Sequence, residues 1–330
     1  MDASSGPSRR AILAGLGGLA AGTISAGYLG AASAEAAIAS RPHWPHTGPW
    51  RLVPDTGAWF GAYPGGGNAP PGPYEAMTGR KLDIVMRYEA LDGAWPNAAD
   101  RALIAEGRWL SVCWSSRLRA TGALATWADV AAGRYDEQIT AQARRLASVG
   151  QVLVGYDNEM DGRSRIARSG PLSDYQAAYH HVRGIVKPIA PDVVWMWCPT
   201  GSNRTKEVAD CYPGDGCVDW ICYDPYDPTL SKGGPLEAYR PFPEWLAKEG
   251  IGAGKPLGIC ETGFHRDRDN AGEAAAWMNA VPDAIAKLGI RMWLWFNSTG
   301  GLGNTSVAPG SVAAGALRKI GSHPILRRPH

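Results

Sequence analysis

Short apolar runs, rich in β-branched and aromatic residues, recur along the chain from residue 58 onward. Each run has the length of a strand, and turn-forming or polar residues follow it, which is typical of strands buried on both faces. The sequence therefore predicts eight strands, within 58–63, 82–88, 109–115, 151–157, 193–199, 218–224, 256–262 and 291–297.

Most segments between these runs have a helical spacing of apolar residues. The segments 135–149, 172–190 and 271–289 are the clearest, with Ser173 expected to cap the second helix and Pro282 to kink or break the third. The expected buried faces are Ile139, Ala143, Leu146 and Ala147 in the first helix, and Tyr175, Ala178, Val182, Ile185 and Val186 in the second.

Strands that alternate with helices predict a parallel sheet with right-handed crossovers. Eight such units suit a single-domain α/β fold, the closed (β/α)₈ TIM barrel. A doubly wound open sheet is the alternative, and it would place a glycine-rich phosphate loop after its first strand. The stretch "GAYPGGGNAPPG" is glycine-rich, but its prolines prevent a helix from starting there.

Composition narrows the function. The chain has 330 residues and a net charge of +2, which gives no electrostatic reason to expect nucleic acid or an anionic membrane as a partner. It contains 14 Trp against 4 Phe, and tryptophans beyond the needs of a core offer flat surfaces on which sugars stack. A sugar is therefore a candidate ligand, no cofactor is expected, and a monomer is the default for a barrel of this size.

The first 34 residues have the pattern of an export signal. Arg9 and Arg10 precede a weakly apolar run rich in glycine and alanine, which ends in Ala32-Ser33-Ala34. This pattern indicates a twin-arginine signal peptide and hence a secreted bacterial protein, with an uncleaved N-terminal anchor as the alternative. Residues 35–54 are predicted to be a linker or N-terminal extension, and 55–330 the catalytic domain.

The six cysteines show no spacing typical of a metal site. Cys211 and Cys217 bracket the turn-forming stretch "YPGDG" and could close a small disulfide loop. The other four lie in apolar runs, where small buried side chains are expected. Histidine pairs at strand ends are also missing, so no metal is expected.

Polar and aromatic residues gather where the apolar runs end. In a (β/α)₈ barrel these strand ends meet on one rim, which carries the active site. The residues of this rim are therefore candidates for chemistry: Arg87, Trp114, Asn158, Glu159, Asp224, Tyr226, Glu261, Trp293 and Trp295.

Glu159 and Glu261 end the fourth and seventh predicted strands, which face each other across a small barrel. Glycoside hydrolysis needs two such carboxyls, one to protonate the leaving oxygen and one to attack or to direct water. Repulsion from Asp157 and Asp161, which flank Glu159, would raise the pKa of the carboxyl that must stay protonated.

Four stretches resemble glycoside hydrolase family 26, a family of retaining (β/α)₈ glycosidases that contains mainly β-mannanases. "NEMDG" (158–162) is similar to the family's acid/base segment, and "KPLGICETG" (255–263) to its nucleophile segment. "YPGDGCVDWICYDPYD" (212–227) resembles the family's sixth strand, and 175–203 resembles the preceding helix and fifth strand. The resemblance extends over roughly residues 57–300.

The resemblance implies roles for individual residues. Glu159 would be the general acid/base and Glu261 the nucleophile. Asp224 and Tyr226 would bind sugar or orient the nucleophile, and Trp293 or Trp295 would form the aromatic floor. The implied function is a secreted, retaining endo-glycosidase that hydrolyses a β-linked polysaccharide, with β-1,4-mannan as the first candidate.

Three positions depart from the family pattern. Asn158 stands where the family has histidine, Gly155 where it has arginine, and Asp161 where it has asparagine. These departures leave two alternatives open: a β-1,3-1,4-glucanase or xylanase of the same family, and a non-catalytic sugar-binding barrel.

Overall fold

The computed structural model of the protein describes residues 51–268, 272–300 and 303–326. All eight predicted strands are present and close into one barrel in sequence order. They are β1 (Trp59–Tyr63), β2 (Ile84–Ala90), β3 (Trp109–Ser115), β4 (Leu153–Tyr156), β5 (Val194–Trp197), β6 (Trp220–Tyr223), β7 (Leu257–Ile259) and β8 (Ile290–Phe296).

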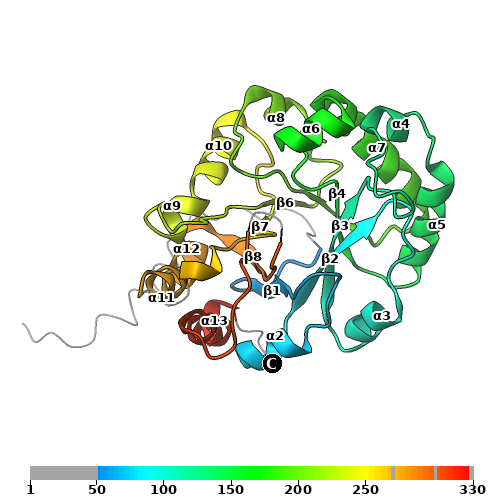
Figure 1. Ribbon diagram of the computed structural model, residues 1–330. Helices are drawn as coiled ribbons and strands as arrows, with labels where there is room; N and C mark the ends of the chain where they lie inside the picture. The colour runs from blue at the N-terminus through cyan, green and yellow to red at the C-terminus, as the bar shows by residue number, and fades with distance from the viewer. Residues whose placement is uncertain (1–50, 269–271, 301–302, 327–330) are drawn as a thin grey trace, which may run out of the picture. The chain divides into compact units, whose positions relative to one another are not determined.

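Every neighbouring pair of strands is parallel, and β1 closes the barrel by pairing with β8. Figure 1 shows the strands at the centre of a ring of helices, with β1 in blue beside β8 in orange. The predicted (β/α)₈ barrel is therefore confirmed, and the open doubly wound sheet is excluded.

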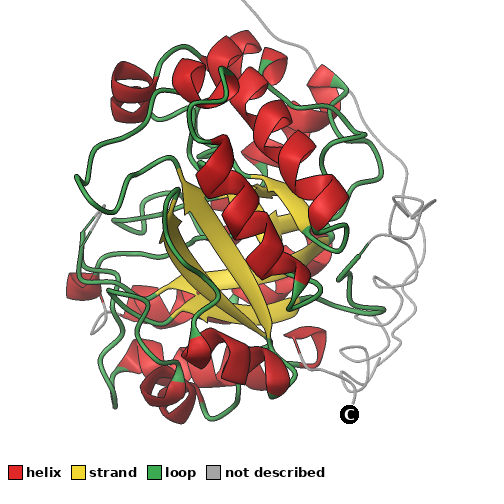
Figure 2. Ribbon diagram, turned by 90° about the vertical axis from the view of Figure 1, so that its right-hand side faces the viewer, coloured by secondary structure: helices red, strands yellow, loops and turns green. Residues whose placement is uncertain are grey.

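Helices follow the strands and cover the outside of the barrel, as Figure 2 shows. The described α-helices are α2 (Gly72–Thr78), α3 (Ala98–Ala105), α4 (Trp127–Ala131), α5 (Asp136–Ala147), α6 (Arg163–Ser169), α7 (Leu172–Ile189), α8 (Lys206–Asp210), α9 (Pro235–Tyr239), α10 (Pro241–Glu249), α11 (Gly272–Asn279), α12 (Val281–Leu288) and α13 (Val312–Ser322). Two 3₁₀ turns, Arg266–Arg268 and Pro324–Leu326, complete the set.

The three predicted helices are present, with local differences. In α5, Gln142 is buried and the predicted Ala147 is exposed. The buried amide of Gln142 is accommodated because its oxygen accepts a hydrogen bond from the backbone N–H of Trp95. Helix α7 begins after Pro171 without a side-chain cap, so Ser173 lies inside its first turn and is not the cap. Pro282 separates α11 from α12 and sits in the first turn of α12, where its missing N–H costs no hydrogen bond.

Two apolar layers hold the barrel. Side chains alternate along each strand, so that one set fills the barrel and the other packs under the helices. The inner set includes Ile84, Met86, Cys113, Leu153, Val194, Met196, Cys198, Trp220, Cys222, Cys260, Met292 and Leu294. Both faces of every strand are thus apolar, which explains the near-continuous hydrophobic runs of the sequence.

The segment 51–54, predicted to be part of a linker, packs against the barrel. The backbone oxygens of Arg51 and Leu52 accept hydrogen bonds from the indoles of Trp220 (2.9 Å) and Trp59 (2.6 Å). The Leu52 side chain is buried with the inner apolar set. These four residues therefore belong to the barrel domain, whereas the predicted signal peptide (1–34) and the rest of the linker lie outside the described residues.

Within the described ranges, no helix is both long and apolar enough to cross a membrane.

Candidate active site

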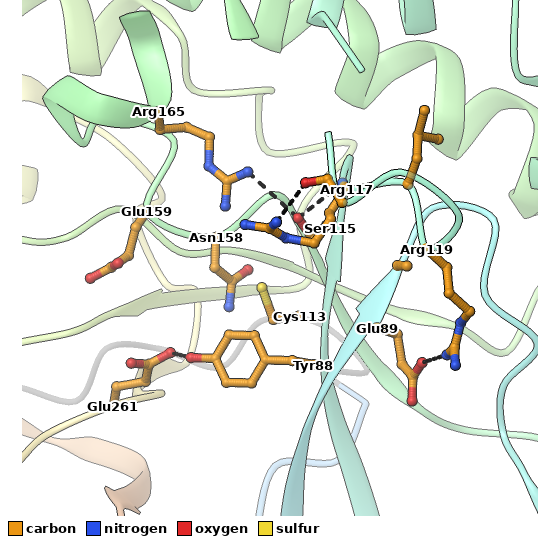
Figure 3. A pocket seen from close by; sticks show the side chains of 13 residues that line it. Tyr88, Glu89, Cys113, Ser115, Arg117, Arg119, Asn158, Glu159, Arg165 and Glu261 are labelled. Atoms are coloured by element: carbon orange, nitrogen blue, oxygen red, sulfur yellow. Dashed lines mark hydrogen bonds and ion pairs between the residues drawn. The ribbon is translucent and has the colours of Figure 1, made fainter. Parts of the chain in front are cut away.

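A cleft of about 520 Å³ opens at the carboxyl ends of β2, β3, β4 and β7. Both glutamates predicted from the sequence, Glu159 and Glu261, line it together with Asn158 and Tyr88. In Figure 3 the two carboxyl groups lie on the same side of the cleft, with the Asn158 amide beside them. The fold therefore brings the fourth and seventh strand ends together, as expected.

The loop after β4 has an unusual backbone. Asp157 and Glu159 have φ values of 50° and 57°, in the left-handed region that non-glycine residues rarely adopt. The amide of Glu159 donates to the carbonyl of Cys198 at 2.7 Å, which ties the loop to the end of β5. Such strain persists only where surrounding contacts fix it, and it is common in functional loops.

Two of the acids in this loop hold it in place. Asp157 is fully buried and accepts hydrogen bonds from Ser116 N (2.9 Å), Ser116 Oγ (2.6 Å) and Trp127 Nε1 (2.6 Å), with Arg165 at 3.2 Å. Asp161 accepts from the amide and hydroxyl of Thr200 at 2.8 and 2.6 Å. Their charges are compensated by donors, which is why an apolar strand can end in an acidic cluster.

Burial and, to a lesser extent, the negative charge of Asp161 raise the pKa of Glu159 to about 7, against the opposing effect of Arg165. A carboxyl with such a pKa keeps its proton near neutral pH and can act as a general acid. The predicted effect of acidic neighbours is thus present, but burial is the larger cause and Asp161, not Asp157, is the neighbour that contributes.

Two tyrosines hold the carboxylate of Glu261. Tyr226 donates to Oε2 at 2.6 Å, and Tyr88 donates to Oε1. Burial and the nearby Glu159 raise the pKa of Glu261 to about 8, while both phenol hydrogen bonds lower it. The pair thus retains a proton near neutral pH. Burial leaves Glu261 with the higher pKa of the two, but the two phenol donors favour its charged form, and on that geometry we assign the shared proton to Glu159.

Asn158 is the other unusual group in the cleft. Its side chain is 4 % exposed, and neither its oxygen nor its nitrogen has a hydrogen-bond partner among the described residues. A buried amide without partners is costly, and such groups in native structures call for an explanation. Because Asn158 lines the cleft, a bound hydroxyl is the partner that its position suits.

Asp224 is buried close to the two glutamates. It is 4 % exposed, its Oδ1 accepts from the thiol of Cys198 at 3.5 Å, and its Oδ2 has no partner among the described residues. Burial and the charges of Glu261 and Glu159 raise its pKa well above the ordinary value. Asp224 and Tyr226 are therefore both close to Glu261, as the resemblance implied.

Four other predicted site residues point away from the cleft. Arg87 is 3 % exposed and pairs with Asp100 of α3 at 2.9 Å, outside the barrel. The indoles of Trp114, Trp293 and Trp295 are fully buried in the layer under the helices. The prediction that these four side chains contact substrate is therefore wrong, because strand alternation turns each of them outward.

Other aromatic side chains form a wall of which the sequence reasoning identified only Tyr226. Tyr63 stacks on Phe296 with ring centroids 5.0 Å apart, and Tyr88 and Tyr226 meet the Phe296 ring edge-on at 6.2 and 6.1 Å. Phe296 alternates with Trp295, and Tyr88 with Arg87. To find these residues, one must know which alternate side chains of each strand face the inside of the barrel. A run that is apolar on both faces does not reveal this.

Cys211 and Cys217 are free thiols, so the predicted disulfide is not present. The thiol of Cys211 donates to the carbonyl of Val208 at 3.2 Å, and the Cys217 sulfur lies 3.6 Å from Nδ1 of His180. In the described part of the chain, no group of three or more histidines, cysteines or acids is arranged to hold a metal ion.

No model of a known protein family matches the chain, and no curated protein matches its sequence. Solved structures are similar in fold. A GH26 β-mannanase from Bacteroides ovatus aligns with a TM-score of 0.62 and 17 % identity, over 82 % of this chain and 90 % of its own. A modular endo-β-1,4-mannanase from Cellulomonas fimi aligns with a TM-score of 0.61 and 18 % identity, over 82 % and 71 %.

A third solved structure, a β-mannanase from a symbiotic protist of the termite Reticulitermes speratus, has a TM-score of 0.52 and 15 % identity, over 77 % of this chain and 82 % of its own. At these identities the likeness concerns the fold: this chain has the barrel architecture found in glycoside hydrolase family 26.

Proposed function

We propose that the protein is a retaining endo-glycosidase that hydrolyses a β-linked polysaccharide, with β-1,4-mannan as the first candidate. The observation that carries the proposal is the pairing of Glu261, held by two phenol hydroxyls, with Glu159, whose pKa is raised to about 7, in one cleft. A nucleophile must be ionised and an acid protonated, and these environments favour that division.

In the proposed reaction, Glu261 attacks the anomeric carbon while Glu159 gives its proton to the leaving glycosidic oxygen. The bond between the anomeric carbon and Glu261 replaces the glycosidic bond, which gives a covalent glycosyl-enzyme. Glu159, now ionised, takes a proton from water, and the resulting hydroxide releases the sugar from Glu261 with retained configuration. Asn158 is placed to bind a hydroxyl of the reacting sugar, and Tyr226 to orient Glu261.

The choice of mannan rests on the solved structures with the same fold, which are β-mannanases. A reducing-sugar assay on β-1,4-mannan, β-1,3-1,4-glucan and xylan tests it. We expect the greatest release from mannan. Release chiefly from glucan or xylan would keep the reaction and replace the substrate, which is the first alternative.

A non-catalytic sugar-binding barrel is the second candidate, because Gly155 and Asn158 depart from the family pattern beside the proposed acid. Binding of a glycan without any release of reducing ends, by protein that is folded and monodisperse, would favour it over the enzyme.

We also propose that residues 1–34 direct export by the twin-arginine route, so that the mature enzyme meets its polysaccharide outside a bacterial cell. The support is the sequence pattern alone. N-terminal sequencing of the protein from its native host tests this proposal, and an intact Met1 on protein retained in the cytoplasm would refute it.

A further inference from the structure

One side of the cleft carries three arginines, which the proposed hydrolysis of a neutral glycan does not use. Arg117 and Arg119 come from the loop after β3, and Arg165 from α6. Figure 3 shows all three beside Asn158 and Glu89. Apart from the catalytic pair, Glu89 is the one carboxylate among the residues that line this cleft.

Two of these arginines already have acidic partners. Arg165 lies 3.2 Å from Asp157, a carboxylate that also accepts hydrogen bonds from Ser116 and Trp127. Arg119 is largely exposed and lies 3.4 Å from Glu89. Each pair still leaves guanidinium N–H groups over for a ligand, because one guanidinium has five donors.

Arg117 differs, because its hydrogen bond goes to a neutral group. Its Nη1 donates to the carbonyl of Gly122 at 2.6 Å, and no ion pair of Arg117 occurs among the described residues. Its backbone is fixed, since its carbonyl accepts from the amide of Leu91 at 2.8 Å and a β-bridge joins it to Leu124. An exposed guanidinium is thus held at the cleft with its charge uncompensated.

A cation beside the proposed general acid favours loss of the proton that the acid must keep. Arg165 lowers the pKa of Glu159, whereas the reaction needs Glu159 to keep its proton. A bound anion would neutralise this cluster and remove the opposition. Carboxylates also match the planar fork of a guanidinium, which binds them through two parallel hydrogen bonds.

We propose that the arginine side of the cleft binds a sugar that bears a carboxylate, so that an acidic β-linked glycan binds more tightly than the neutral glycan of the same linkage. This inference rests on the proposed function for the position of the glycan, and it names the substrate class of the same site. Arg117 is the principal contact, with Arg119 and Arg165 adding to the positive field.

Two oligosaccharides that differ only at C6 provide the test: a hexamer of β-1,4-linked mannuronate and β-1,4-mannohexaose. Binding of each is measured by calorimetry at low ionic strength to the full chain carrying Glu261→Gln, with Glu159→Gln as a second inactive background. We expect the mannuronate hexamer to bind about tenfold or more tightly, and the preference to shrink when salt screens the charges.

Arginine variants test which side chain causes the preference for the mannuronate hexamer. Arg117→Gln should lower the ratio of the two affinities about tenfold, and Arg117→Lys should restore part of it, because lysine keeps the charge but not the fork. Arg168→Gln is the matched control: Arg168 is exposed on the same helix as Arg165, does not line the cleft, and its loss should leave the ratio unchanged. Melting temperatures establish that each variant is folded.

The outcomes separate this inference from the proposed reaction. Equal or tighter binding of mannohexaose, or an unchanged ratio in Arg117→Gln, would overturn the acidic substrate and leave the glycosidase standing. Preferential binding of the mannuronate hexamer by a protein that cleaves no glycan would support the acidic subsite and refute the proposed reaction. If neither hexamer binds, the inference is wrong.

Discussion

The hydroxyl of Tyr226 donates a hydrogen bond to Oε2 of Glu261 at 2.6 Å, and this contact connects the end of β6 with the end of β7. The Tyr226 ring also lies edge-on to Phe296 of β8. The proposed nucleophile thus accepts hydrogen bonds from two members of the aromatic wall, Tyr88 and Tyr226, and the wall as a whole comes from the ends of β1, β2, β6 and β8.

Replacing Tyr226 by phenylalanine should lower turnover about tenfold or more while hardly changing the melting temperature, because the ring stays and one hydrogen bond to Glu261 is lost. The pKa of Glu261 should rise without that donor, so the acidic limb of the pH profile should move to higher pH. Kinetics over pH and calorimetry measure both effects.

The matched control is Tyr179→Phe, which removes a hydroxyl that donates to the backbone of Met196 at 3.3 Å, away from the cleft. A large loss of stability with unaltered turnover in Tyr226→Phe would return Tyr226 to the structural core.

Glu159→Ala should lose orders of magnitude in turnover on polysaccharide but much less on an aryl glycoside, whose leaving group needs no proton. Steady-state kinetics on both substrates measure the difference, with the exposed Glu137→Ala of α5 as the control. Equal losses on the two substrates would contradict the role of general acid.

Glu261 should be the residue that a fluorosugar inactivator labels, and NMR of the first product should show retained anomeric configuration. Retention requires the two carboxyls about 5–5.5 Å apart, and inversion roughly 6.5–9.5 Å. The shorter separation between Glu159 and Glu261 stays a prediction for a crystal structure. Mass spectrometry that finds the label on another acid would overturn the assignment.

Stability should depend on pH through Glu159. Its pKa is raised from 4.5 to about 7, so the folded state binds this proton more tightly than the unfolded state. The contribution is full below the unfolded value of 4.5 and is lost as pH rises through about 7. Glu159→Gln has no such titration. Between low and high pH, its free energy of unfolding should therefore improve relative to that of the wild type by roughly 2 kcal/mol, a figure reduced to allow for the partial exposure of Glu159.

Denaturant unfolding at pH 4 and pH 8 measures this difference, with Glu137→Gln as the control. Parallel changes in the stability of the wild type and Glu159→Gln would show that Glu159 titrates normally.

Asn158→Ala should lower activity without lowering stability. The variant removes a buried amide that has no partner among the described residues, so the lost packing is offset by the removed desolvation penalty. The same amide is expected to bind a sugar hydroxyl, so kcat/KM should fall about tenfold or more. Melting curves and kinetics together decide, and full activity with reduced stability would make Asn158 a structural residue.

The sequence predicted the fold and the meeting of Glu159 and Glu261 in one cleft for a physical reason. Eight runs that are apolar on both faces indicate buried parallel strands, and every strand of such a barrel delivers its last residue to the same rim. Glu159 and Glu261 lie shortly after the ends of β4 and β7, at Tyr156 and Ile259, so the topology brings them to one cleft.

The direction of individual side chains within a strand could not be predicted from the hydrophobic pattern. In β8, Trp293, Trp295 and Phe296 are all apolar, and both faces of the strand are buried, so the pattern does not tell which side chain faces the cleft. The arginines were also missed. Arg117, in the loop after β3, and Arg165, in α6, reach the same cleft only through the folding of these two connecting segments, which no strand periodicity records.

Gly155 and Asn158 constrain how this lineage of sequences can change. A Cβ atom on Gly155 would lie 2.0 Å from Oδ1 of Asn158, so any side chain at 155 forces the amide out of its place. Replacement of Gly155 by arginine should therefore be harmful as a single mutation unless position 158 changed as well. The two sites are epistatic, and a search for altered specificity that samples them one at a time will miss the combinations that work.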